Sequence, residues 1–162
     1  MFIKKFESFN SNNILLGDGI SNLDFIKPYL YDNQKLDGIK TDIWRLEARL
    51  DKKTIGFCSY FELEDGKNYW KSHLLSVSTP YREDPLYKNL SILIRLLTFG
   101  SIGRPTAISQ DLSNSGSGFV KKWEREGIWT LGELSQTLTD VGKKESQKFS
   151  KKFLGINRLN WV

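Results

Sequence analysis

Few side chains of this sequence can do acid–base or nucleophilic chemistry near neutral pH. His73 is the only histidine, and an imidazole ordinarily titrates at about pH 6.5, so it is a candidate general base. A structural place on a strand is the alternative for this residue. Cys58 is the only cysteine, so no internal disulfide can form, and one thiol with one imidazole is too little for a zinc site. Disulfide scaffolds and zinc fingers are therefore excluded.

Serine-based chemistry finds no support in the local sequence either. The run Ser-Asn-Ser-Gly-Ser-Gly at 113–118 is rich in glycine and serine, but it lacks the Gly-Lys-Ser/Thr ending of a phosphate-binding loop. A Ser-His-Asp triad would have to use His73, and no serine stands in a nucleophile-elbow sequence. No local motif by itself therefore fixes a reaction.

Composition is typical of a globular protein. A chain of 162 residues, 39% hydrophobic and 13% aromatic, is large enough for one core, and we expect a single domain over 1–162. The longest apolar stretch, 92–99, is interrupted by Arg95, so no membrane-spanning segment is predicted. Residues 1–6 lack the long apolar run of a secretory signal, and we expect a cytoplasmic protein.

Most of the net charge lies near the C-terminus. The chain carries 24 Lys and Arg against 19 Asp and Glu, a formal charge of +5. Residues 135–162 hold six basic side chains against two acidic ones. Such a basic segment can attract nucleic acid or an acidic partner protein. The simpler interpretation is the solvated face of a helix, and no zinc-finger or basic-zipper pattern accompanies it.

The first half of the chain has the alternation and composition of β-strands. Alternating apolar and polar residues indicate a half-buried strand over 42–50. Runs of β-branched and aromatic residues indicate two more strands, over 54–63 and 69–79. We expect these three strands to form an antiparallel meander. Before this meander we predict a strand over 1–9 and a short helix over 21–30. Pro28 lies inside that predicted helix, which would be kinked there.

The second half changes to helical spacing. Leucine and isoleucine recur three and four residues apart, which predicts an amphipathic helix from about Pro85 to Phe99. The elements expected after it are a strand at 105–110, a helix at 113–126, a strand at 128–131, a basic helix at 141–154 and a final strand at 157–162. The order is therefore β, α, three antiparallel strands, then α-β-α-β, which is an α/β arrangement.

This order resembles that of the GNAT acyltransferase superfamily. The family has V-x-P-x-Y-R/Q-x-x-G-x-G/A before an amphipathic helix, and Val77, Tyr81 and Arg82 match it. A second segment, 108–128, is similar to the family's strand, Ser/Asn turn and helix ending in Gly-Phe. The resemblance covers roughly residues 40–132 and is closest to small phage-encoded GNAT-like proteins. It implies a mixed, mostly antiparallel central sheet with helices on both faces.

The resemblance implies an acyl-CoA-dependent N-acyltransferase that transfers an acetyl group to an amine. In the family, the strand ending at Val77 parts from its neighbour and pairs with the pantetheine arm of acetyl-CoA or another acyl-CoA. The N-terminus of the next helix then holds the pyrophosphate. The cofactor-binding residues implied for this chain are Leu75, Ser76, Val77, Arg82, Glu83, Asp84, Leu86, Tyr87, Lys88 and Ser113.

Acyl transfer needs a base for the attacking amine and an acid for the departing thiolate. His73 is the best candidate base, and Glu62 or Glu64 could act through a water molecule. The family's usual acid is a tyrosine at the position of Trp123, whose indole cannot supply a proton, so Tyr87 or Tyr81 is the expected substitute. Packing is the alternative role for each of these side chains.

The loop before the predicted helix also supports a second hypothesis. Pro85 and Tyr87 stand where the family has glycines, and proline has no N–H to offer a phosphate. Glu83 and Asp84 add two negative charges beside the anion site. These residues favour a protein that keeps the fold, has lost catalysis, and binds a host protein or nucleic acid for a phage or mobile element. The basic segment 135–162 supports a third hypothesis, DNA modification as in the Mom-type phage proteins that resemble GNAT folds.

Overall fold

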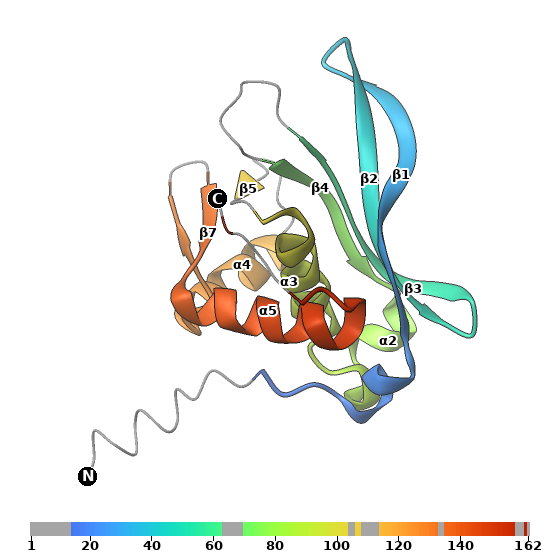
Figure 1. Cartoon of the computed structure of the whole chain (residues 1–162), viewed down its shortest axis with the longest axis vertical. Helices are drawn as coiled ribbons and strands as arrows, with labels where there is room; N and C mark the ends of the chain where they lie inside the picture. Colours follow the sequence, from blue (N-terminus) through green and yellow to red (C-terminus); the bar gives the residue numbers. More distant parts are fainter. Residues whose placement is uncertain are drawn as a thin grey trace.

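The computed structural model describes residues 14–62, 70–103, 106–107, 114–132, 135–157 and 161. Within them the chain is a mixed α/β protein built on a sheet of order β1-β2-β3-β4-β5-β7-β6 (Figure 1). The elements are η1 (Asp18–Asn22), β1 (Asp24–Leu36), β2 (Ile39–Leu50), β3 (Lys53–Glu62), β4 (Trp70–Val77), α2 (Thr79–Arg82), η2 (Pro85–Tyr87), α3 (Leu90–Ile102), β5 (Thr106–Ala107), α4 (Asn114–Arg125), β6 (Trp129–Leu131), β7 (Ser135–Leu138) and α5 (Asp140–Leu154).

The predicted antiparallel meander is confirmed as β2, β3 and β4. Asp51 and Lys52 join β2 to β3 with φ values of 49° and 69°, and positive φ at both central residues gives a turn whose twist matches that of the strands. Leu46 lies opposite Cys58, which in turn lies opposite Leu75. An apolar row therefore crosses the three strands on one face of the sheet.

The helix predicted over 21–30 is wrong, because residues 21 and 22 end the short 3₁₀ turn η1 and residues 24–30 begin the long strand β1. Asp37 and Gly38, with φ of 51° and 80°, turn the chain so that β1 pairs antiparallel with β2. Pro28 is tolerated because β1 is the outermost strand of the described sheet, where a missing N–H breaks no ladder. The pairing register shifts between Ile26 and Tyr29, around the proline.

Helix α3 is the centre of the core. It begins at Leu90 and not at Pro85 as predicted, because Pro85 instead opens the short 3₁₀ turn η2. The helix is buried on every side from Ile92 to Gly100, so it is not the amphipathic helix expected from its leucines. A helix that is apolar all round is one enclosed by other elements.

Helices α3 and α5 lie on the same face of strands β1 to β4 (Figure 1). A Cβ atom at Gly56 of β3 would meet Ile94 of α3 at 2.8 Å, so helix and sheet are in close contact there. Phe153 of α5 packs against Phe25 of β1 with ring centroids 5.0 Å apart. The core of the β1–β4 half therefore lies on this face.

The C-terminal half follows the predicted order with one addition. The helices predicted over 113–126 and 141–154 are confirmed as α4 and α5, and the strand predicted over 128–131 as β6. Strand β7 was not predicted. It pairs with both β5 and β6, and Thr139 then accepts a hydrogen bond from the Gly142 N–H to start α5. The strand predicted at 1–9 and most of those at 105–110 and 157–162 lie outside the described residues, and Asn157 and Trp161 are not in a strand.

Candidate functional site

Among the residues that the structure describes, strand β4 is paired along its whole length on one side but only at its beginning on the other. Strand β3 pairs with it from Trp70 to Val77. The parallel neighbour β5 pairs only with Trp70 and Lys71. Within the part of the chain that the structure describes, the edge of β4 from Ser72 to Val77 thus has no partner in β5. Backbone donors and acceptors at such an edge are available to an extended ligand.

A β-bulge interrupts β4 at His73. Ser59 lies opposite Leu74 and Tyr60 opposite Ser72, so His73 is the extra residue of this strand. Its side chain is exposed and its ring lies 6.4 Å from that of Phe61. A bulge redirects a side chain and locally disturbs the ladder, and here it does so beside the unpartnered edge of β4.

A cavity of about 150 Å³ opens where β4 ends. The residues that line it come from the end of β4, the turns α2 and η2, the start of α3 and one face of α4: Val77, Tyr81, Arg82, Tyr87, Asn89, Leu90, Ser91, Ile92, Phe119 and Trp123. Enclosing a whole drug-sized ligand takes roughly 300–1,000 Å³. This cavity therefore has room for one end of a cofactor and not for all of it.

The start of α3 is left without a side-chain cap. Asn89 precedes the helix with φ 65° and makes no capping hydrogen bond, because its amide donates to the Leu15 carbonyl oxygen at 2.8 Å. The first N–H groups of a helix have no partner within it. Leu90, Ser91 and Ile92, which carry those groups, all line the cavity.

Two glycines hold the loop before α3 in place. A Cβ atom at Gly17 would lie 2.3 Å from the Leu86 carbonyl oxygen, and one at Gly19 would lie 2.9 Å from the same atom. The Gly17 N–H also donates to the Lys88 carbonyl oxygen at 3.1 Å. The segment before β1 therefore packs directly under η2, and this close approach is why both positions need glycine.

The structure brings together only some of the predicted cofactor-binding residues. Val77, Arg82 and Tyr87 line the cavity, while Leu75 and Ser76 lie just before it on β4. Asp84 accepts a hydrogen bond from the Leu86 N–H at 2.9 Å and so caps η2. The predicted residues that are exposed and do not line the cavity are Glu83, Leu86 and Lys88. Ser113 lies outside the described residues.

The candidate catalytic residues do not form one cluster. Tyr87 lines the cavity at the C-terminal end of β4 and contacts Tyr81 edge to face, with ring centroids 5.1 Å apart. His73 is four residues earlier than Val77, or about 13 Å along an extended strand. Glu62 is exposed at the end of β3, opposite Trp70, and Glu64 lies outside the described residues. The distance along β4 matches a ligand that lies along the strand, and not one held within the cavity.

The sequence analysis placed Phe119 and Trp123 inward but gave neither a role in ligand binding. Both project from α4 into the cavity that Val77 and Ile92 line on the other side. Their spacing of four residues puts them on one face of a helix, and Gly127 with φ 79° follows its end. The helical spacing of Phe119 and Trp123 was visible in the sequence. Helical spacing alone, however, does not distinguish residues that line a cavity from residues buried in the core.

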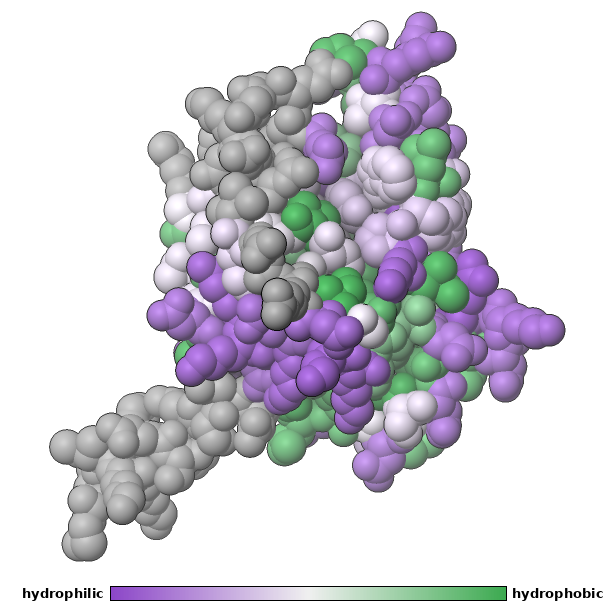
Figure 2. All heavy atoms as spheres, in the orientation of Figure 1, coloured by the Kyte–Doolittle hydropathy of each residue, from purple (hydrophilic) through white to green (hydrophobic). Residues whose placement is uncertain are grey.

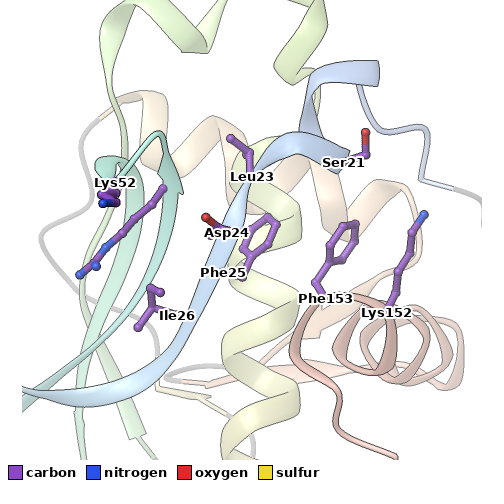
Figure 3. A pocket seen from close by; sticks show the side chains of 9 residues that line it. Ser21, Leu23, Asp24, Phe25, Ile26, Lys52, Lys152 and Phe153 are labelled. Atoms are coloured by element: carbon purple, nitrogen blue, oxygen red, sulfur yellow. The ribbon is translucent and has the colours of Figure 1, made fainter.

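A second, larger hollow of about 570 Å³ lies at the start of β1. It is lined by Ser21, Leu23, Asp24, Phe25, Ile26, Arg49, Lys52, Lys152 and Phe153. Figure 3 shows the rings of Phe25 and Phe153 beside one another, with Lys52 and Lys152 on opposite sides of the pair. Its cations are partly neutralised, since Arg49 forms an ion pair with Glu47. No residue predicted for the site lies here.

The basic segment forms β7 and α5, and its lysines lie on the outer side of α5. The exposed surface of this helix is a hydrophilic band in Figure 2, and Lys148 pairs with Glu145 at 2.6 Å. Phe149 and Leu154 on the other side of α5 are buried. Nucleic-acid binding by this band stays a prediction. None of the described helices is long and apolar enough to cross a membrane.

No family model, curated protein or solved structure matches the chain. The resemblance to the GNAT superfamily stays a prediction from the sequence, based on the segment at 75–82 and on the expected order of the elements. Any activity of the chain is accordingly a proposal.

Proposed function

We propose that this protein is an acyl-CoA-dependent N-acyltransferase, with the acyl-CoA arm lying along the edge of β4. One observation carries the proposal: within the described residues β5 pairs with β4 at only Trp70 and Lys71, so an extended ligand can pair with the strand from Ser72 to Val77. The cavity at the end of the same edge would take the pyrophosphate. His73 lies near the opposite end, where the thioester would meet an amine.

The electrostatics of the cavity support an anionic group. The N-terminus of a helix carries roughly +0.5 of an elementary charge, and here it has no side-chain cap. Arg82 also lines the cavity, although its Nη2 donates to the Thr79 hydroxyl at 2.7 Å. Pro85 removes one N–H from the preceding loop, but α3 begins five residues later, so the donors of Leu90, Ser91 and Ile92 are unaffected by it.

We expect Ser91→Asp to weaken the binding of acetyl-CoA at least tenfold. A carboxylate in the first turn of α3 interacts favourably with the helix dipole, so the fold should be kept while the pyrophosphate is repelled. Isothermal titration calorimetry with acetyl-CoA measures the affinity.

Ser91→Asn is the matched control, because it adds the same volume without charge and should bind within a few fold of the parent. If the parent chain binds no acetyl-CoA at high micromolar concentration, the proposal fails. Equal affinities of Ser91→Asp and the parent would place the pyrophosphate outside this cavity.

We expect His73→Gln to lower kcat/KM for acetyl transfer to a primary amine by roughly 100-fold or more, the usual contribution of a general base. The affinity for acetyl-CoA should not change, because His73 is exposed and distant from the cavity. Release of CoA thiol with butylamine as the acceptor measures the rate. Lys71→Gln, two residues away on the same strand, is the control, and parent-like rates for His73→Gln would assign the base elsewhere.

A binding protein that has lost catalysis is the second candidate. The size of the cavity and the carboxylate of Asp84, which caps η2 beside it, favour this function. Acyl transfer that is lost in Arg82→Ala would contradict it. Absence of acetyl-CoA binding in a folded chain would favour it over the enzyme.

A further inference from the structure

The face of strands β1 to β4 opposite α3 carries a group that neither candidate function uses. Arg45 lies on this face in β2, in register with Ser59 of β3, which in turn lies opposite Leu74 of β4. The helices that contact β1–β4 in the described chain, α3 and α5, both pack on the other face (Figure 1). Tyr31 and Leu74 on this open face are 48% and 50% exposed.

The guanidinium of Arg45 is held between two aromatic rings. Its Cζ atom lies 3.5 Å from the ring centroid of Tyr31 and 3.7 Å from that of Phe57. Its Nε donates to the hydroxyl of the buried Ser59 at 3.1 Å. Both planar faces and one edge are therefore occupied, and little conformational freedom remains to be lost when a ligand binds.

Within the described part of the chain, the remaining edge of Arg45 has no counter-ion. Among the described residues, Arg45 makes no ion pair, its one side-chain hydrogen bond is that of Nε to Ser59, and the residue is half-buried. The nearest carboxylate along β2 is that of Glu47, which already accepts hydrogen bonds from Arg49, Thr54 and Tyr29. A fixed guanidinium fork with two free nitrogens matches the two oxygens of a carboxylate or phosphate.

We propose that Arg45, between Tyr31 and Phe57, is a binding site for an oxyanion attached to an apolar body. The anion pairs with the Nη atoms, and the body covers the exposed parts of Tyr31 and Leu74. The open face does not fit a long nucleic-acid strand, because such binding neutralises several phosphates. In the described strands β2 to β4, the pairing register places only two cations on this face that are not paired to Glu47, namely Arg45 and Lys71. The site is independent of the acyltransferase proposal.

Titration of the full chain with small probes tests the site. The probes are benzoate and phenyl phosphate, which distinguish the carboxylate from the phosphate source, and neutral benzamide. The readout is the Arg45 Nε–H signal in ¹H–¹⁵N NMR spectra of the parent and, in every variant including Arg45→Lys, the backbone amide signal of Ser59, whose hydroxyl contacts Arg45 in the parent. Both signals come from this face of the sheet, so phosphate binding at the start of α3 is not counted. We expect at least one anion to shift this signal saturably, benzamide to leave it unchanged, and Arg45→Lys to reduce the affinity at least fivefold.

Arg125→Lys is the matched control, because Arg125 is exposed in the last turn of α4, and it should bind like the parent. Tyr31→Leu removes only one of the two rings that enclose the Arg45 guanidinium, and it should weaken binding about threefold. This second variant keeps the test valid if Arg45→Lys does not fold. Equal, unsaturable shifts at every arginine, or parent-like affinity in both Arg45→Lys and Tyr31→Leu, would overturn the proposal. Loss of acetyl-CoA binding in Ser91→Asp leaves this result unaffected.

Discussion

Gly100→Val should destabilise the protein by about 3 kcal/mol, at the upper end of what overpacking a core costs. Gly100 lies where α3 and α5 cross, and a Cβ atom there would lie 2.1 Å from the Ser150 Oγ and 2.9 Å from the Ser146 Oγ. Ser146 cannot turn aside freely, because its hydroxyl donates to the Leu96 carbonyl oxygen at 2.7 Å. The two helices must therefore move apart. Thermal unfolding followed by circular dichroism should show a Tm about 10 °C lower.

Gly118→Val is the control, because Gly118 is also in a helix but a Cβ atom there meets nothing within 4 Å. Glycine and valine differ by only a few tenths of a kcal/mol in helix propensity, so this variant should melt close to the parent. Adding Ser150→Gly to Gly100→Ala should recover part of the loss of the alanine variant, since it removes the nearest side chain. A Tm for Gly100→Val equal to the parent's would contradict the close packing of α3 on α5.

The local pattern predicted the meander and the C-terminal helices but not the first hairpin. Leu23, Ile26 and Leu30 follow helical spacing, yet Ile26 and Leu30 lie in β1 and Leu23 directly precedes it, because the chain turns at Asp37 and Gly38 and pairs with β2. An Asp-Gly pair is a strong hairpin signal, and the one at 37–38 was not used in the prediction. Pro28 was interpreted as a helix kink, although an edge strand also accepts proline.

Only those residues of the candidate site that are close together in the sequence could be predicted. Val77, Arg82 and Tyr87 are close in sequence and line one cavity. Their contacts with Phe119 and Trp123 depend on how α4 packs after more than thirty intervening residues, which no local pattern specifies. Arg95 illustrates the same limit. It interrupts an apolar run and was expected only to exclude a membrane span, yet it is 6% exposed inside the core, beside the Cys58 thiol at 3.8 Å.

The Arg45 stack was equally invisible in the sequence. Tyr31, Arg45 and Phe57 belong to three different strands, and their contacts depend on the register shift between Leu30 and Asp32 that turns Tyr31 onto this face. A single residue added to or removed from β1 would reverse the faces of its side chains. Strand periodicity predicts a half-buried face in such a case, but it does not predict which cation on that face remains unpaired.

Glu47→Gln should destabilise the protein by about 2–3 kcal/mol at neutral pH, the range found for hydrogen bonds to a charged group. The Glu47 side chain is buried on β2, and its carboxylate accepts hydrogen bonds from the Thr54 hydroxyl at 2.6 Å, the Arg49 Nε at 2.9 Å and the Tyr29 hydroxyl. The amide of glutamine keeps the shape but not the charge, and it can accept fewer of these hydrogen bonds. Urea unfolding at pH 7 measures the difference, with the exposed Glu124→Gln of α4 as the control.

The same substitution should also change how stability depends on pH. Burial raises the pKa of Glu47, but the hydrogen bonds from Thr54, Tyr29 and Arg49 outweigh it and hold this pKa below its ordinary value. A carboxyl whose pKa is lower in the folded than in the unfolded chain contributes its stability above the unfolded pKa, about 4.3 for glutamate. That contribution is lost as the pH falls from there through the folded pKa. The parent should therefore lose more stability than Glu47→Gln between neutral pH and about pH 3, and parallel pH profiles of the two would show that Glu47 is not held in this network.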